Sequence, residues 1–218
     1  MVQNNLVKKI TMVVIGNLFI GIAVALLRIT EFGTDPFTTL NLGISSVLPI
    51  SFGLYQLLFN IVLLGFVFLY YKSSIGLGTL INMVGIGFIS DFLVFCYQSL
   101  FDDMPILAIR IVLILLAVVL ASLGVALYIT PNLGMAPYDA LGFVVEKISH
   151  QKISFPVARV SLDIISVAIG FTFGATVGFA TIILAFCTGP FVQFFRKTIA
   201  QPMLNKSSHI PSHKKKLA

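Results

Sequence analysis

Apolar residues are arranged along this chain in six long runs, separated by short polar segments or by segments that contain glycine and proline. Each run comes close to the roughly 20 residues that an α-helix needs to cross the hydrocarbon layer of a bilayer. The pattern predicts an all-α membrane protein. Its six transmembrane helices are expected over residues 10–29, 53–71, 75–97, 106–128, 155–173 and 175–195.

Residues 35–49 and 136–149, between these runs, are too apolar for solvated loops and too short to cross a membrane. Their apolar residues recur at helical spacing, which predicts a short amphipathic helix in each segment. Asp35 can cap the first helix with its side chain. Pro36 suits the first helical position because it has no N–H group that would be left unpaired there, and Pro137 begins the second helix. Each helix is expected either to lie flat at the membrane surface or to enter the membrane as a re-entrant half-helix, whose N-terminus favours an anion.

The chain also repeats its own landmarks. Three patterns recur in the same order, 101 to 103 residues apart. They are Gly33-x-x-Pro36 with Gly134-x-x-Pro137, Ser51-Phe52 with Ser154-Phe155, and Gly76-x-x-Thr79 with Gly178-x-x-Thr181. Such agreement in order and spacing indicates two copies of one unit.

Each copy holds three long runs, and an odd number of crossings places the second copy upside down relative to the first. The predicted fold is therefore two inverted three-helix repeats, each with an extra short amphipathic or re-entrant helix. The expected boundaries are an N-terminal segment over 1–9, repeats over 10–101 and 102–197, and a basic tail over 198–218. Inverted repeats that meet near the bilayer midplane are a common architecture of secondary transporters.

Composition agrees with this class. Hydrophobic residues make up 58% of the chain, charged residues make up 10%, and the mean hydropathy is +1.03. Because a soluble domain carries about 25% charged residues, this chain has too little polar surface to remain in water.

Basic residues are distributed unevenly among the segments that join the predicted helices. If both termini are cytoplasmic, 11 of the 14 lysines and arginines lie on the cytoplasmic side. These are Lys8, Lys9, Lys72, Lys147, Lys152, Arg196, Lys197, Lys206, Lys214, Lys215 and Lys216. The bias predicts cytoplasmic N- and C-termini, and it explains the net charge of +6 without a nucleic-acid partner.

Polar side chains occupy equivalent positions inside two predicted helices. Arg159 and Asp163 lie four residues apart on one face of a helix and can pair, while Gln56 and Asn60 hold the corresponding positions in the first copy. A charge inside a membrane is costly unless it meets a partner or a water-filled cavity. The four side chains are expected to line one solute-binding cavity, where Arg159 binds an acidic group and Asp163 orients the solute or carries a coupling proton.

A second charged pair is expected between Asp91 and Arg110, which lie at similar distances from the acidic loop that joins their helices. For both charged pairs, the alternative is an ion pair that only holds helices together.

Several motifs together resemble the YczE/YyaS/YitT-type family of bacterial multi-pass integral membrane proteins. They are Gly134-x-x-Pro137-Tyr138-Asp139, the stretch Ile75-Gly-Leu-Gly-Thr-Leu-Ile-Asn82, Arg159-x-x-x-Asp163 and Gly189-Pro190. The resemblance covers roughly residues 10–195 and implies a protein of the bacterial plasma membrane. It carries over no substrate and no reaction.

The chain departs from the family pattern at both loop motifs. The family often has tryptophan after the motif proline, where this chain has Phe37 and Tyr138. An acidic residue commonly follows; Asp139 keeps it in the second copy, whereas Thr38 replaces it in the first. The two loops are therefore not expected to play identical roles.

The sequence predicts no enzyme, since it contains no HExxH, GxSxG, P-loop or Rossmann glycine pattern. No cofactor or metal is expected. Cys96 and Cys187 lie within apolar runs, which is typical of small core residues.

Two functional classes remain. One is a small secondary transporter or exporter of a polar or anionic organic solute, either a homo-oligomer or a compact monomer. Its solute-binding residues are expected in the helices at Arg159, Asp163, Gln56 and Asn60 and in the loops at Gly33, Asp35, Pro36, Gly134, Pro137 and Asp139. The alternative is a non-transporting membrane partner, such as the substrate-binding subunit of an energy-coupled importer or a membrane scaffold.

Overall fold

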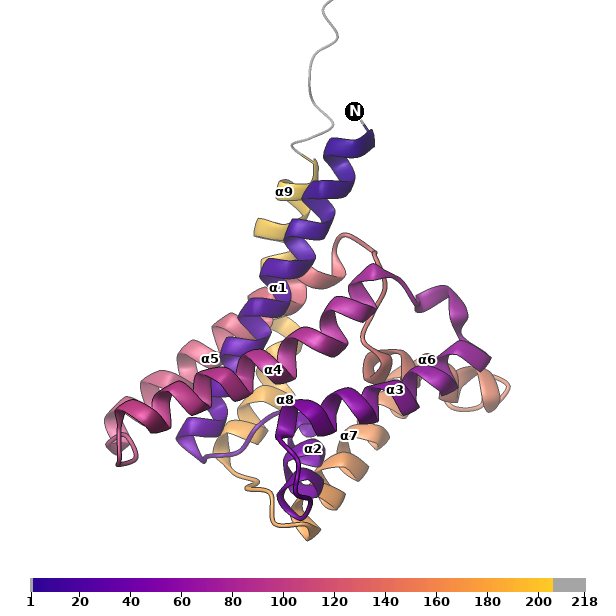
Figure 1. Cartoon of the computed structure of the whole chain (residues 1–218). Helices are drawn as coiled ribbons and strands as arrows, with labels where there is room; N and C mark the ends of the chain where they lie inside the picture. The colour runs from indigo at the N-terminus through magenta and orange to yellow at the C-terminus, as the bar shows by residue number, and fades with distance from the viewer. Residues whose placement is uncertain (1, 206–218) are drawn as a thin grey trace, which may run out of the picture.

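The computed structural model describes residues 2–205, and every regular element within that range is helical (Figure 1). The elements in chain order are α1 (Val2–Thr30), α2 (Pro36–Ser46), α3 (Phe52–Tyr70), η1 (Lys72–Ser74), α4 (Leu77–Leu100), α5 (Leu107–Ile129), α6 (Pro137–Ile148), α7 (Phe155–Thr172), α8 (Phe179–Phe195), η2 (Arg196–Ala200) and α9 (Gln201–Asn205). Six helical stretches are long and apolar enough to cross a membrane. This confirms the predicted all-α membrane protein with six long helices and two short ones.

The C-terminal end differs from the prediction. Residues 198–205, expected to belong to a tail, continue the last long helix through the π-helical turn η2 and the short helix α9. Ala200 is fully buried in an apolar cluster with Met12 of α1 and Leu127 of α5, and this contact extends the helix beyond its most apolar stretch. The remainder of the predicted tail, residues 206–218, lies outside the described residues.

The helices pack in two groups. In the first group, α1 packs against α4 and α5, and α8 packs against α5. Its core is apolar, with Leu27 of α1, Val118 of α5 and Leu184 of α8 in one buried cluster. In the second group, the short helices α2 and α6 each pack against both α3 and α7, and the contact of α3 with α4 joins the two groups.

Small residues allow α1 and α5 to cross closely. A Cβ atom at Gly124 would lie 2.6 Å from the carbonyl oxygen of Gly16, and a Cβ at Gly16 would lie 2.6 Å from that of Gly124. The two backbones therefore touch without intervening side chains, as is common where helices cross in membranes.

Replacing Gly124 by alanine is expected to destabilise the protein by about 2 kcal/mol, because the new methyl group forces the two backbones apart. Gly189 provides the matched control, since a Cβ atom there meets no atom within 4 Å. Gly189→Ala is expected to be neutral or to stabilise the helix by up to about 1 kcal/mol. Thermal unfolding of both variants in detergent measures the difference, and equal unfolding temperatures would contradict the close crossing.

The short helices begin as the sequence predicts. The Asp35 side chain accepts a hydrogen bond from the Thr38 amide at 3.1 Å and caps α2, whose first residue is Pro36, and Pro137 begins α6. However, the apolar stripe is not the main buried surface of α2. Thr38, Thr39 and Asn41 of this helix are buried, because α2 packs closely along α7 at Gly43 and Gly170 rather than against an apolar core.

The loops before the short helices make matched contacts with the two long helices that begin with a Gly-x-x-Thr motif. The Gly78 amide donates to the carbonyl of Leu133 at 2.7 Å, and the Ala180 amide donates to the carbonyl of Phe32 at 3.0 Å. Each loop from one half of the chain thus docks on the first turn of a long helix from the other half.

Candidate functional site

Arg159 of α7 lies at the centre of a charged network. Its guanidinium Nη1 donates to Asp139 Oδ1 of α6 at 2.8 Å, and its Nε lies 3.3 Å from Asp163 Oδ2, one turn further along α7. The predicted pairing of Arg159 with Asp163 is therefore observed. The Arg159 side chain is 31% exposed, so the network is only partly shielded from its surroundings.

Two tyrosines donate hydrogen bonds to the two carboxylates, and a serine contacts one of these tyrosines. The Tyr138 hydroxyl donates to Asp163 Oδ1 at 2.7 Å and lies 3.1 Å from the Ser166 hydroxyl. The Tyr128 hydroxyl donates to Asp139 Oδ2 at 3.2 Å and accepts from the Ala136 amide at 2.6 Å. The network thus joins α5, α6 and α7.

The N-terminal ends of α2 and α6 meet beside this network. Phe37 and Tyr138, the residues that follow the two motif prolines, stack with their ring centroids 4.5 Å apart. The Arg159 guanidinium lies over the Tyr138 ring, 4.7 Å from its centroid. The aromatic pair therefore joins the two short helices at the point where the charged side chains gather.

Asp35, the N-cap of α2, is close enough to interact electrostatically with Arg159 and Asp163. Burial raises the pKa of the Asp35 carboxyl above its ordinary value, and the negative charge of Asp163 acts in the same direction. Burial also raises the pKa of Tyr138, so its hydroxyl stays protonated and remains a donor to Asp163. Two carboxylates, those of Asp139 and Asp163, pair with the Arg159 guanidinium, and Asp35 adds a third acidic group near them.

Of the predicted quartet, only Arg159 and Asp163 form an ion pair among the described residues. Gln56 and Asn60 are buried in α3, and within the described part of the chain no hydrogen bond joins them to Arg159 or Asp163. Gln56 instead faces α4, since its Oε1 would lie 3.1 Å from a Cβ atom at Gly87. The side-chain oxygens of both amides lack a hydrogen-bond partner among the described residues.

The loop glycines among the candidate residues have a backbone role. Gly33 and Gly134 have φ of 95° and 109°, a region that residues with a side chain rarely adopt. Gly33 packs against the Thr181 hydroxyl, and Gly134 packs against that of Thr79. Thr79 Oγ1 also donates to the Met135 carbonyl at 2.9 Å, so these contacts hold the loops in place.

The predicted pair of Asp91 and Arg110 is wrong. Asp91 Oδ1 accepts from Arg28 Nη1 of α1 at 2.8 Å, and its Oδ2 accepts from the Gly53 amide at the start of α3 at 2.7 Å. Arg110 instead donates from Nε to the Thr30 carbonyl at 2.7 Å. The reason is the packing of α1 against both α4 and α5, which places its C-terminal end near each of the two residues.

The sequence alone does not indicate a role for Tyr128, Ser166 or Phe37 in the network. Tyr128 ends an apolar run, and its polar hydroxyl was the only available signal. Asp139 and Tyr138 lay in the predicted loop motif, but nothing in the sequence paired Asp139 with Arg159. No group of three or more His, Cys, Asp or Glu side chains within residues 2–205 is placed to hold a metal ion.

Comparison with known proteins identifies relatives along most of the chain. A model for a family of unknown function, DUF6198, matches residues 7–197. An uncharacterized protein of Haemophilus influenzae is 30% identical over 207 residues, which cover 95% of this chain and 89% of the relative.

Two relatives come from Bacillus subtilis. The uncharacterized membrane protein YczE is 26% identical over 162 residues, covering 74% of this chain and 73% of YczE. The uncharacterized protein YyaS is 24% identical over 195 residues, covering 88% of this chain and 94% of YyaS. These matches confirm the resemblance to YczE and YyaS. No solved structure matches the chain.

Proposed function

The chain belongs to the family of unknown function DUF6198, and we propose that it is a small secondary transporter whose solute binds at the Arg159 network. The observation that carries this proposal is the meeting of α2 and α6 at the Phe37–Tyr138 ring pair, beside Arg159. Ionisable groups inside a membrane protein usually mark a pathway for a solute or an ion. Short helices whose N-terminal ends lie at such groups are a common way to build a transporter site.

The charges of the network favour a solute that carries a positive group. Arg159 already pairs with Asp139 and Asp163, so an anionic solute would have to displace one of these carboxylates. The N-terminal turns of α2 and α6 also hold carboxylates of the chain itself, those of Asp35 and Asp139. A protonated amine on the solute, or a coupling proton, supplies the positive charge that a single guanidinium does not.

The proposal includes the inverted arrangement of the two repeats. It is supported by contacts that occur twice at matched positions, such as Gly78 with Leu133 and Ala180 with Phe32. The stacked residues Phe37 and Tyr138 also hold equivalent positions in the two copies, so they mark the line where the repeats meet.

We further propose that the protein lies in the bacterial plasma membrane with both termini in the cytoplasm. Elements predicted on one side of the membrane also contact one another. Lys147 of α6 donates to the Tyr70 carbonyl at the end of α3, and Ser46 at the end of α2 donates to the Phe173 carbonyl just after α7. These contacts support the alternation of the helices, and the positive-inside bias supplies the direction.

A non-transporting membrane partner is the second candidate. It is favoured by the saturation of Arg159, which makes ion pairs to two carboxylates without any ligand. In that case, the network would hold α6 and α7 together and would bind no solute.

A thermal-shift screen of the purified protein in detergent, followed by flux measurements in liposomes, tests the proposal. The panel holds polyamines, basic amino acids, neutral amino acids and organic acids. A ligand at about 100 times its dissociation constant stabilises the fold by about 2.7 kcal/mol. We expect stabilisation by an amine, its loss in Asp139→Asn, and flux of the same amine by the wild-type protein.

Asp103→Asn is the matched control, because Asp103 is exposed in the loop between α4 and α5 and takes no part in the network. This variant should keep the stabilisation. Stabilisation by an organic acid instead would overturn the proposal that the solute carries a positive group. Binding without flux would favour the non-transporting membrane partner.

A further inference from the structure

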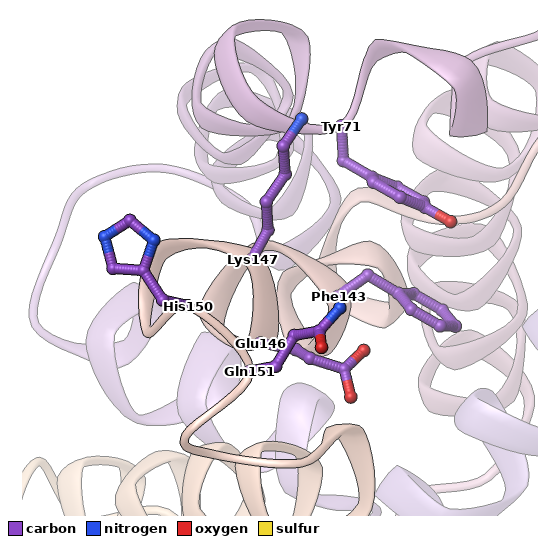
Figure 2. A pocket seen from close by; sticks show the side chains of 6 residues that line it. All are labelled: Tyr71, Phe143, Glu146, Lys147, His150 and Gln151. Atoms are coloured by element: carbon purple, nitrogen blue, oxygen red, sulfur yellow. The ribbon is translucent and has the colours of Figure 1, made fainter.

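A pocket of about 500 Å³ lies away from the Arg159 network, at the C-terminal ends of α3 and α6. It is lined by Tyr71, Phe143, Glu146, Lys147, His150 and Gln151. In Figure 2 the rings of Tyr71 and Phe143 lie on one side of the pocket and His150 on the other, with the Lys147 side chain between them.

The pocket lies at the level where membrane-spanning helices end. The span of α3 ends at Tyr70, directly before Tyr71, and the span of α7 begins at Phe155, four residues after Gln151. A pocket at this position faces the boundary between hydrocarbon and water, where the headgroups of the lipids lie.

Positive charge dominates this boundary. Lys147 and His150 line the pocket and are exposed, and the exposed residues Lys72 and Lys152 adjoin its lining in the sequence. Lys147 donates one N–H to the Tyr70 carbonyl at 2.8 Å, which fixes the ammonium near the pocket and leaves its other N–H groups for a ligand.

The acidic residue of the lining is engaged elsewhere. Glu146 Oε1 accepts a hydrogen bond from the Phe155 amide at 3.0 Å, at the N-terminal end of α7. The carboxylate therefore lies against the N-terminal end of α7, whose partial positive charge reduces the repulsion between Glu146 and an anion in the pocket.

Two aromatic rings of the lining are held in place by stacking. The Phe143 ring stacks on Tyr71 at 5.2 Å and on Phe155 at 4.2 Å. Ile148 and Ile153 do not line the pocket, but they lie on either side of His150 in the sequence and are 50% and 40% exposed. The Lys147 ammonium in the pocket and the exposed apolar residues beside it suit a ligand with both a charged and an apolar part.

From this arrangement, we propose that the pocket binds the phosphate headgroup of an anionic phospholipid, with the Lys147 ammonium as its cationic contact and the His150 imidazole as a hydrogen-bond donor. Basic pockets between membrane helices on the cytoplasmic side are suited to such headgroups. The apolar surface near Ile148 and Ile153 would accompany the upper part of the acyl chains. This site is independent of solute binding at Arg159.

Binding of short-chain lipids to the delipidated protein in detergent tests this inference. The probes are dihexanoyl phosphatidylglycerol, the zwitterionic dihexanoyl phosphatidylcholine, glycerol phosphate and inorganic phosphate. We expect phosphatidylglycerol to bind best and the double variant Lys147→Gln/His150→Asn to bind it roughly tenfold more weakly, since each basic contact contributes several-fold.

The substitutions are chosen to keep the fold. Asparagine tolerates the positive φ of 52° at position 150, and glutamine retains a donor for the Tyr70 carbonyl. Lys197→Gln is the control, because it removes a charge from an exposed residue of η2 outside the pocket. Unchanged phosphatidylglycerol binding in the double variant, or equal binding of phosphatidylcholine, would overturn the site; equal binding of glycerol phosphate would replace the lipid with a soluble phosphoester.

Discussion

Arg159→Met is expected to lower the free energy of unfolding by about 2–3 kcal/mol. It is also expected to abolish solute binding, because Asp139 and Asp163 lose the guanidinium that holds both carboxylates in position. The substitution leaves Asp139 and Asp163 without their shared guanidinium in a partly buried site. The loss is smaller than for a fully buried pair, because the three side chains are about one third exposed. Chemical unfolding in detergent and the thermal-shift screen measure the two effects.

A variant without charges in the network separates the role of Arg159 in stability from its role in solute binding. The triple variant Asp139→Asn/Arg159→Met/Asp163→Asn removes every charge of the two ion pairs, so no carboxylate in them is left unpaired. We expect it to recover most of the stability lost in Arg159→Met, because replacing a whole ion-pair network by neutral groups is often nearly free of cost. Solute binding should remain absent.

The function of the triple variant decides between the two candidate functions. If binding and flux returned together with stability, the charges would be dispensable for the solute and the network would be structural. If stability did not return, the hydrogen bonds from Tyr128 and Tyr138, rather than the charges, would hold the helices together.

Arg28→Met is expected to destabilise the protein by about 3–4 kcal/mol without acting on the proposed solute site. The Arg28 and Asp91 side chains are only 15% and 22% exposed, and Arg28 also donates to the Ser90 hydroxyl at 2.8 Å. Removing Arg28 leaves Asp91 with the Gly53 amide as its remaining hydrogen-bond donor among the described residues. Three helices, α1, α3 and α4, lose their common contact.

Arg110→Met is the matched control for this variant. Arg110 donates to a neutral carbonyl, that of Thr30, and stacks over the Phe32 ring at 4.1 Å, so its removal leaves no carboxylate unpaired. A loss of about 1 kcal/mol is expected. Unfolding of both variants in the same detergent measures the two losses. Equal losses would show that the Arg28–Asp91 ion pair contributes no more to stability than the contacts of Arg110.

Local features of the sequence were enough to find the helices. Hydropathy depends on contiguous residues, so the six long helices followed from composition along each run. The caps of the short helices are equally local, since Asp35 and Pro36 act on the helix that they begin. The pairing of Arg159 with Asp163 was also predictable, because residues four apart on a helix always share a face.

Only the tertiary structure decided which helices meet, and this determined the site. Asp139 joins Arg159 because α6 packs along α7, and Gln56 stays apart because it faces α4. Asp91 pairs with Arg28 because α1 packs against α4. Such partners depend on how each helix is rotated and packed against its neighbours, which no run of neighbouring residues encodes. By itself, the sequence determined the class of the protein and the residues that carry charge, and packing chose their partners.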